Sequence, residues 1–174
     1  MARLGVLLLA AAVSSAGAQQ PNFSGDWVRT DTTGGRTVSN AGDAAFRRGD
    51  MGIGWGNSIT ISQRPDSLIL EYDFFSSYDL QPRVRFAYAM NGAESKNGIM
   101  LSHSEEPQVG KLSWQGTSLV ITTLHPLPKA AGAGRYEVRQ TLSVDASGAL
   151  RVETTRGPVM GGAGSTLQAT YIRK

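Results

Sequence analysis

The sequence contains no cysteine and only two histidines, His103 and His125, among its 174 residues. Without cysteine the chain can form no disulfide, no thiolate nucleophile, no cysteine-based zinc site and no iron–sulfur cluster. Two histidines are also too few for a multi-histidine metal site. We therefore expect no metal and no other cofactor, and a domain that is held together by the packing of its own core.

Basic residues are not concentrated anywhere in the chain. The formal net charge is only +3, and there is no run of five or more Lys or Arg. Arg47 and Arg48 form the only adjacent basic pair before the terminal Arg173 and Lys174. Proteins that bind nucleic acid carry a basic patch or stripe, so this class of function is excluded. The glycine-rich stretches do not lead from a predicted strand into a helix, so no phosphate-binding loop is predicted either.

The first 18 residues have the three parts of a cleavable secretory signal. Arg3 provides a positive start, residues 4–13 form an apolar run, and Ala16 and Ala18 give the Ala-x-Ala pattern of a cleavage site. Ten apolar residues are too few for a membrane span. Because no cysteine follows the run, we expect no lipid anchor. The sequence predicts export to the periplasm or the medium, cleavage near Ala18, and one mature domain over residues 19–174.

Short segments in which apolar and polar residues alternate recur along the rest of the chain, which is the pattern of antiparallel β-strands. Turn residues such as Pro65-Asp66, Asn91-Gly92 and Gly116-Thr117 separate them. The predicted strands are residues 24–29, 58–64, 67–73, 83–90, 99–104, 111–115, 118–124, 135–145, 150–155 and 166–173. The pattern predicts an all-β fold, an antiparallel meander of about nine or ten strands that closes into a barrel.

Both ends of this domain resemble those of a known superfamily. Phe23-Ser24-Gly25-Asp26-Trp27 opens the first predicted strand, and Arg173 lies at the end of the last one. A Gly-x-Trp sequence on the first strand with an Arg on the last is similar to the calycins, which include lipocalins, fatty-acid-binding proteins and avidins. The resemblance implies a lipocalin-like barrel in which Trp27 closes one end and Arg173 lies across its ring as a structural cation–π pair. It implies no ligand-binding residue.

The alternation also predicts which side chains face the interior of the barrel. They are Ile59, Ile61, Leu68, Leu70, Tyr72, Phe74, Val84, Phe86, Tyr88, Met90, Leu112, Trp114, Tyr136 and Val138. Aromatic rings with polar tips suit the wall of a ligand site. The candidate ligand-binding residues are therefore Tyr72, Tyr88, Trp114 and Tyr136, together with Trp55. We expect Trp55, which lies in a glycine-rich loop, to fold over the barrel mouth or to pack on the outer wall.

The leading functional hypothesis is an exported lipocalin-like protein that binds a small apolar or amphipathic ligand in its barrel. A packed interior without a cavity is the alternative for the barrel itself. An exported interaction module or inhibitor, with an unknown protein partner, is a further reading that rests on analogy.

An acid–base enzyme at the barrel mouth is the other alternative. The candidate catalytic residues are His103, Glu105 and His125. This reading requires a histidine that points into the barrel within hydrogen-bond reach of a carboxylate such as Glu105, Glu137 or Asp73. However, His103 lies in a polar turn and His125 precedes a proline, so we expect both histidines at the surface or the rim.

Overall fold

The computed structural model describes residues 19–30, 55, 58–73, 83–98, 106–127, 134–158 and 164–174. The predicted export signal at residues 1–18 lies outside the described residues, as do the predicted strand at residues 99–104 and the candidate residues His103, Glu105 and Phe74. The described part forms an all-β domain with ten strands, which confirms the predicted fold class.

The strands follow the alternating segments of the sequence. They are β1 (Gly25–Arg29), β2 (Ser58–Gln63), β3 (Ser67–Asp73), β4 (Arg83–Ala89), β5 (Ser95–Asn97), β6 (Gln108–Gln115), β7 (Ser118–Pro126), β8 (Arg135–Val144), β9 (Leu150–Arg156) and β10 (Ser165–Arg173). The predicted tight turns are present: the N–H of Arg64 donates to the carbonyl of Ser67 at 2.8 Å, and Gly92 and Gly116 have φ angles of 80° and 61°. Such positive φ angles favour glycine.

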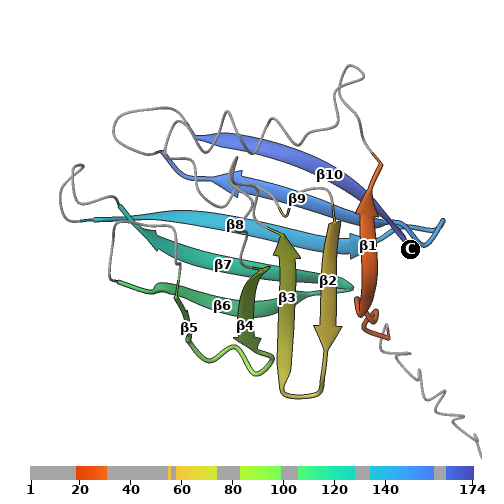
Figure 1. Cartoon of the computed structure of the whole chain (residues 1–174), viewed down its shortest axis with the longest axis horizontal. Coiled ribbons are helices and arrows are strands. Elements are labelled where there is room, and N and C mark those ends of the chain that lie inside the picture. Colours follow the sequence, from red (N-terminus) through yellow and green to blue (C-terminus); the bar gives the residue numbers. More distant parts are fainter. Residues whose placement is uncertain are drawn as a thin grey trace, which may run out of the picture.

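All ten strands belong to one antiparallel sheet in the order β4-β3-β2-β1-β10-β9-β8-β7-β6-β5. Figure 1 shows that β1 to β4 cross in front of β6 to β10 at a steep angle, so that the sheet folds over on itself. The two edge strands, β4 and β5, are consecutive in the chain and close to each other in space. The sheet is therefore a nearly closed barrel, and its side chains alternate between the interior and the solvent.

The seam between β4 and β5 is closed by side chains in place of a backbone ladder. The side-chain amide of Asn97 accepts a hydrogen bond from the N–H of Ala87 at 2.8 Å and donates one to the carbonyl of the same residue at 3.1 Å. Nearer the turn between β4 and β5, the hydroxyl of Ser95 accepts a hydrogen bond from the N–H of Ala89 at 2.9 Å. Two polar side chains thus occupy the edge of β4 where a further strand would otherwise pair.

This seam corrects one part of the sequence prediction. Residues 95–97, Ser-Lys-Asn, were expected to connect two strands, yet they form β5. The segment is short and polar, so it has no alternation of apolar residues to reveal it. It becomes a strand because it pairs with β6, through Asn97 and Gln108, and because the Asn97 amide binds β4 from the other side.

Asn97→Ala should lower the free energy of unfolding by about 1–3 kcal/mol, because it removes two hydrogen bonds from a buried side chain. Lys96→Ala is the matched control: Lys96 lies next to it on β5 but is exposed, so its loss should change the free energy by at most about 0.5 kcal/mol. Urea unfolding of both variants measures the difference. Equal effects of the two substitutions would show that the Asn97 amide does not hold the seam.

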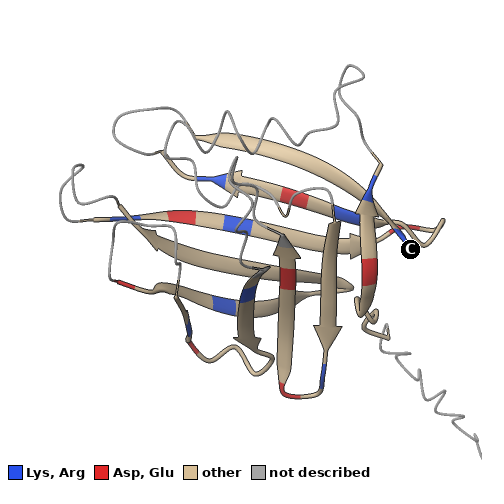
Figure 2. Ribbon diagram, viewed as in Figure 1, with Lys and Arg blue, Asp and Glu red and all other residues tan. Residues whose placement is uncertain are grey.

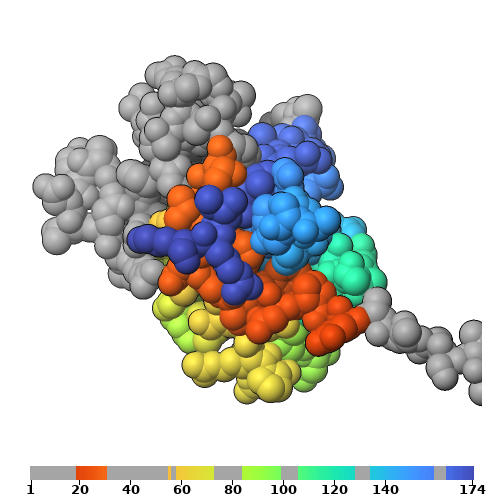
Figure 3. Space-filling model, turned by 90° about the vertical axis from the view of Figure 1, so that its right-hand side faces the viewer, coloured from red at the N-terminus to blue at the C-terminus, as the bar shows by residue number. Residues whose placement is uncertain are grey.

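The barrel has two different ends. Four short turns, between β2 and β3, β4 and β5, β6 and β7, and β8 and β9, lie at one end, here called the turn end, together with the start of β1 and the end of β10. The strand ends that are joined by the five longer connections lie at the opposite end, here called the loop end. In Figure 3 the N-terminal segment (orange) and the last residues of β10 (dark blue) lie side by side across the turn end, as the pairing of β1 with β10 requires.

Trp27 closes the turn end from inside. Its side chain is 1% exposed, its Nε1 donates to the carbonyl of Phe23 at 2.9 Å, and the guanidinium carbon of Arg173 lies 4.8 Å from the centre of its ring. The contact between Trp27 and Arg173 that the sequence resemblance implies is thus present in the structure. Gly25 has a φ of 144° beneath this pair, a conformation that other residues rarely adopt. The Gly-x-Trp sequence therefore has a local physical reason.

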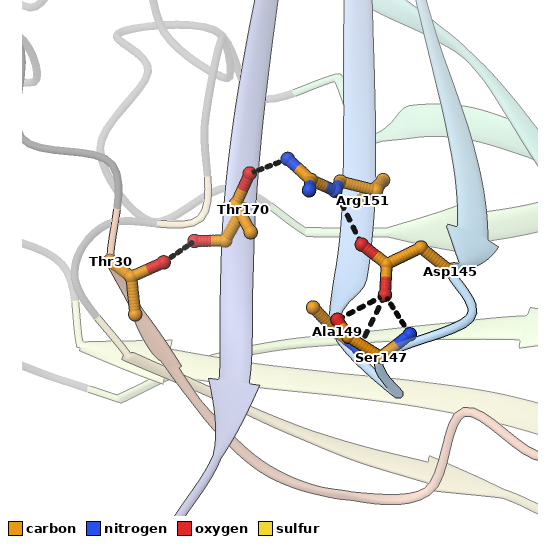
Figure 4. A network of polar contacts seen from close by, with 6 residues as sticks. All are labelled: Thr30, Asp145, Ser147, Ala149, Arg151 and Thr170. Atoms are coloured by element: carbon orange, nitrogen blue, oxygen red, sulfur yellow. Dashed lines mark hydrogen bonds and ion pairs between the residues drawn. The ribbon is translucent and has the colours of Figure 1, made fainter.

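The turn between β8 and β9 is fixed by one carboxylate (Figure 4). Oδ1 of Asp145 accepts bonds from the hydroxyl and the N–H of Ser147 and from the N–H of Ala149, and Oδ2 accepts one from Nε of Arg151 at 2.9 Å. Arg151 also donates to the hydroxyl of Thr170 on β10 at 2.6 Å. The hydrogen bonds from Ser147 and Arg151 lower the pKa of Asp145 to about 2. This network stays charged at neutral pH and ties β8, β9 and β10 together.

Charged residues of both signs are spread along the strands and at the turns (Figure 2). Ion pairs join Arg85 on β4 with Glu71 on β3 at 3.8 Å, and Lys111 on β6 with Glu94 in the turn before β5 at 3.3 Å. Exposed pairs of this kind contribute at most about 1 kcal/mol each. They keep this surface polar. Within the described ranges, no helix is both long and apolar enough to cross a membrane.

Candidate functional site

The interior of the barrel is divided into an apolar half and a more polar half. At the turn end the inward side chains are large and apolar, and they belong to one cluster of buried residues that also includes Tyr72, Phe86 and Tyr88. Its best-buried members, each at most 1% exposed, are Phe23, Trp27, Ile59, Ile61, Leu68, Leu70, Leu119, Ile121, Leu142, Leu150 and Tyr171. Phe23 stacks on Trp114 with ring centres 6.0 Å apart. This half of the barrel is filled by the protein itself.

Polar side chains occupy inward positions further toward the loop end. They are Gln108 on β6, Thr123 on β7, Gln140 on β8 and Thr154 on β9, each buried. The register places them on the face that also carries Ile121, because Ile121 pairs with Gln140, which in turn pairs with Thr154. Sequence reasoning missed all four because it followed apolar residues only. For Thr123, Gln140 and Thr154 the signal was their spacing, since each lies two residues from a buried apolar neighbour on its own strand.

His125 lies at the loop end of β7, on the same inward face. It pairs with Tyr136 on β8, and the two rings stack with centres 5.1 Å apart and planes 17° apart. Although the histidine is only 6% exposed, its Nδ1 is buried and has no hydrogen-bond partner. Burial lowers the pKa of His125 to about 4, so the imidazole is neutral at physiological pH.

The expectation that His125 would lie at an exposed rim is therefore wrong. The sequence prediction ended this strand at residue 124 because a proline follows His125. In the structure β7 continues through Pro126, which pairs with Arg135 at the last position of the strand. A proline is tolerated at such an end. The alternation Leu119, Ile121, Thr123, His125 was the signal that this histidine faces inward.

Tyr88 joins the polar wall from the other side of the seam. Its hydroxyl shares hydrogen bonds with the side chains of Thr123 and Gln108, and burial raises its pKa to about 12. Gly110 makes this approach possible, because a Cβ at that position would overlap the Tyr88 ring. Burial, with Tyr88 and Tyr171 nearby, also raises the pKa of Tyr72 above its usual range. These phenols are neutral and act as hydrogen-bonding groups inside the barrel.

Five residues were predicted to bind a ligand. Three of them, Tyr72, Tyr88 and Tyr136, are buried at inward positions, and Trp114 is partly buried against the core. Trp55 is 3% exposed and belongs to the same cluster of buried residues. The predicted interior is confirmed for all thirteen described members of the set, which are buried or partly buried.

The loop end of the interior is accessible to solvent on the β10 side. Leu167 pairs with Thr154 and so lies on the inward face, yet it is 49% exposed. Arg156 and Ser165 pair with each other two residues further toward the loop end and lie on the same face. The inward face of β10 is therefore in contact with solvent at Leu167.

The structure brings no carboxylate to His125 among the residues that it describes. Glu137 pairs with Leu124, so both lie on the outer face while His125 and Tyr136 face inward. Glu106 is exposed and forms an ion pair with Arg135 at 3.1 Å. The inward positions of the described strands carry no Asp or Glu at all. A neutral imidazole among phenols, amides and hydroxyls is suited to hydrogen bonding with a ligand more than to acid–base catalysis.

Metal binding has no support in the same region. Over residues 19–30, 55, 58–73, 83–98, 106–127, 134–158 and 164–174, no three His, Cys, Asp or Glu side chains gather in a way that could hold an ion. The described polar groups of the interior include amides, hydroxyls, phenols, the imidazole of His125 and the guanidinium of Arg156, all of which can form hydrogen bonds.

The chain matches no protein-family model and no curated protein sequence. Its classification therefore depends on the architecture: ten antiparallel strands in a meander, with the two edge strands brought together at a seam that side chains close. The protein is a nearly closed, ten-stranded β-barrel.

Proposed function

We propose that this protein binds a small amphipathic molecule inside its barrel, near the loop end. The observation that carries the proposal is His125, whose buried Nδ1 has no hydrogen-bond partner on the inward face of β7. Leaving a buried polar atom unsatisfied costs about 1–3 kcal/mol. A polar group of a bound ligand would satisfy that atom and recover this free energy.

The surroundings of His125 support a ligand with both polar and apolar parts. Thr123 and Gln108 supply polar groups nearby on β7 and β6, whereas Tyr72 and Phe86 provide aromatic surface on β3 and β4. Binding sites for small molecules commonly combine apolar walls with a few polar groups in this way. The half-exposed Leu167 marks the side from which a ligand would enter.

The calycin resemblance supports the same proposal. The antiparallel meander is the expected architecture, and Trp27 and Arg173 make the expected contact at the turn end. Many barrels of this architecture carry small ligands at the end opposite such a closure. We therefore propose a lipocalin-like binding protein whose ligand enters at the loop end.

Two exposed leucines allow a direct test with the neutral fluorescent probe N-phenyl-1-naphthylamine. Leu167 is 49% exposed on the inward face and Leu124 is 39% exposed on the outer face, so a charged residue at either position is compatible with folding. We expect the wild type to bind one probe molecule with an increase in probe fluorescence. Leu167→Glu should weaken binding at least about fivefold, and Leu124→Glu should leave it unchanged.

The pattern across these variants decides the question. No saturable binding by the wild type would contradict the proposal, and so would an equal loss of affinity in both variants, because the probe would then bind the outer surface. Far-ultraviolet circular dichroism of each variant confirms that the barrel is intact.

A further inference from the structure

Two pairs of aromatic rings lie on the inward face of the barrel. His125 and Tyr136 form one stacked pair on β7 and β8, and Tyr72 and Phe86 form another on β3 and β4, with ring centres 5.8 Å apart. In the strand order, β3 and β8 are five strands apart in a sheet of ten, so they lie on opposite sides of the barrel. Figure 1 shows β3 crossing in front of β8. A flat ring bound beside His125 would contact the aromatic surface of the stacked His125 and Tyr136 rings.

Most of the hydrogen-bonding groups are on one of these sides, and the hydroxyl of Tyr88 on the other side is already bonded to Thr123 and Gln108. The inward positions of β6 to β9 include Gln108, Thr123, His125, Gln140 and Thr154. Across the barrel, the inward positions of β2 and β3 that lie above the turn are apolar apart from the tip of Tyr72. A matching ligand therefore has its polar groups along one edge, since groups on the opposite edge would be buried without partners.

The packed turn end limits the size of the ligand. The interior at the turn end is filled by side chains that are each at most 1% exposed, among them Trp27, Leu119, Leu142, Leu150 and Tyr171. A long hydrocarbon chain that extended from His125 toward the turn end would have to displace these side chains. Displacing close-packed side chains would break packing contacts that stabilise the fold. The site is consequently suited to a short, flat molecule.

From these three observations we infer that the ligand is a compact aromatic molecule with one hydrogen-bonding edge, and that His125 binds this edge. The inference rests on the proposed function and names the chemical class of the ligand. It distinguishes this barrel from one that carries a long-chain lipid. His125 provides one donor and one acceptor as a neutral imidazole, so a hydroxyl group on the ligand can pair with it.

Two probes of nearly the same shape test the inference. 2-Naphthol and 2-methylnaphthalene differ in one hydroxyl against one methyl group, and both can be followed by their own fluorescence. The affinity for each probe is first corrected for its partition between water and an apolar solvent. After this correction, we expect the wild type to bind 2-naphthol about tenfold more tightly than 2-methylnaphthalene. His125→Phe keeps a ring beside Tyr136 but removes both nitrogens. In this variant the preference for 2-naphthol should disappear. Cis-parinaric acid, a long-chain fluorescent lipid, should bind more weakly than 2-naphthol.

The outcomes separate this inference from the proposed function. Tight binding of cis-parinaric acid with weak binding of 2-naphthol would overturn the inference and leave the proposed binding function intact. An equal preference of wild type and His125→Phe for the hydroxyl would overturn the role of His125. If none of the three probes binds, both the inference and the proposed function are wrong. Urea unfolding of His125→Phe verifies that the variant is folded.

Discussion

Trp27→Ala is expected to lower the free energy of unfolding by about 3–5 kcal/mol, the usual cost of removing a large aromatic side chain from a core. Trp27 is among the largest fully buried side chains and belongs to the core cluster at the turn end. Its loss removes buried apolar surface, the hydrogen bond from Nε1 to Phe23 and the ring beneath the Arg173 guanidinium. Urea unfolding followed by circular dichroism measures the effect.

Two milder variants keep this prediction testable if the alanine variant does not fold. Trp27→Phe retains most of the ring but loses the hydrogen bond to Phe23, so we expect a cost of about 1–2 kcal/mol. Arg173→Ala should cost about 1 kcal/mol, because the guanidinium is exposed and the cation–π contact is worth that much at such a site.

A double-mutant cycle isolates the contact between the two side chains. If the indole is a better partner for the guanidinium than a phenyl ring, Arg173→Ala should lower the free energy of unfolding clearly less in the Trp27→Phe background than in the wild type. Additive effects would mean that the two side chains stabilise the turn end independently. A cost below about 1 kcal/mol for Trp27→Ala would contradict the assignment of Trp27 as the closure of this end.

The strands of this barrel were predictable where one face of the strand is apolar. In β3, Leu68, Leu70 and Tyr72 alternate with residues of the other face, and the predicted and observed bounds agree at residues 67–73. β5 could not be predicted in this way, because its place depends on the Asn97 side chain and its hydrogen bonds to Ala87, ten residues earlier. Such a contact leaves no periodic signal in the sequence.

The candidate site was predictable only in part. The aromatic residues Tyr72, Tyr88 and Tyr136 were chosen correctly as inward, since they continue the apolar alternation of their strands. His125 and Gln140 were not placed inside, because polar residues at inward positions interrupt that alternation when only apolar residues are considered. Their burial is decided by the strand register, and the register depends on the pairing of β7 with β8. A site made of polar residues inside a barrel is therefore harder to read from one sequence than the barrel itself.

Buried His125 should make the protein less stable in mild acid. The pKa of this histidine is about 4 in the folded barrel and 6.5 in its usual range, so the unfolded chain binds the proton more tightly. The free energy of unfolding is therefore unaffected by His125 above about pH 7, falls as the pH drops from 6.5 toward 4, and levels off below that. At about 1.4 kcal/mol for each pH unit, the loss over this range is about 3 kcal/mol.

A comparison of wild type with His125→Phe isolates this contribution from those of all other titrating groups. Asp145, whose pKa is about 2, stays ionised over the whole range and is present in both proteins. Urea unfolding of both proteins should be measured at intervals from pH 7.5 to pH 4. We expect the stability of the variant relative to the wild type to increase by about 3 kcal/mol as the pH falls, because only the wild type must bury a base that acid would protonate. Two parallel curves would show that the His125 imidazole can take up a proton inside the folded barrel, and hence that it is not as deeply buried as the structure places it.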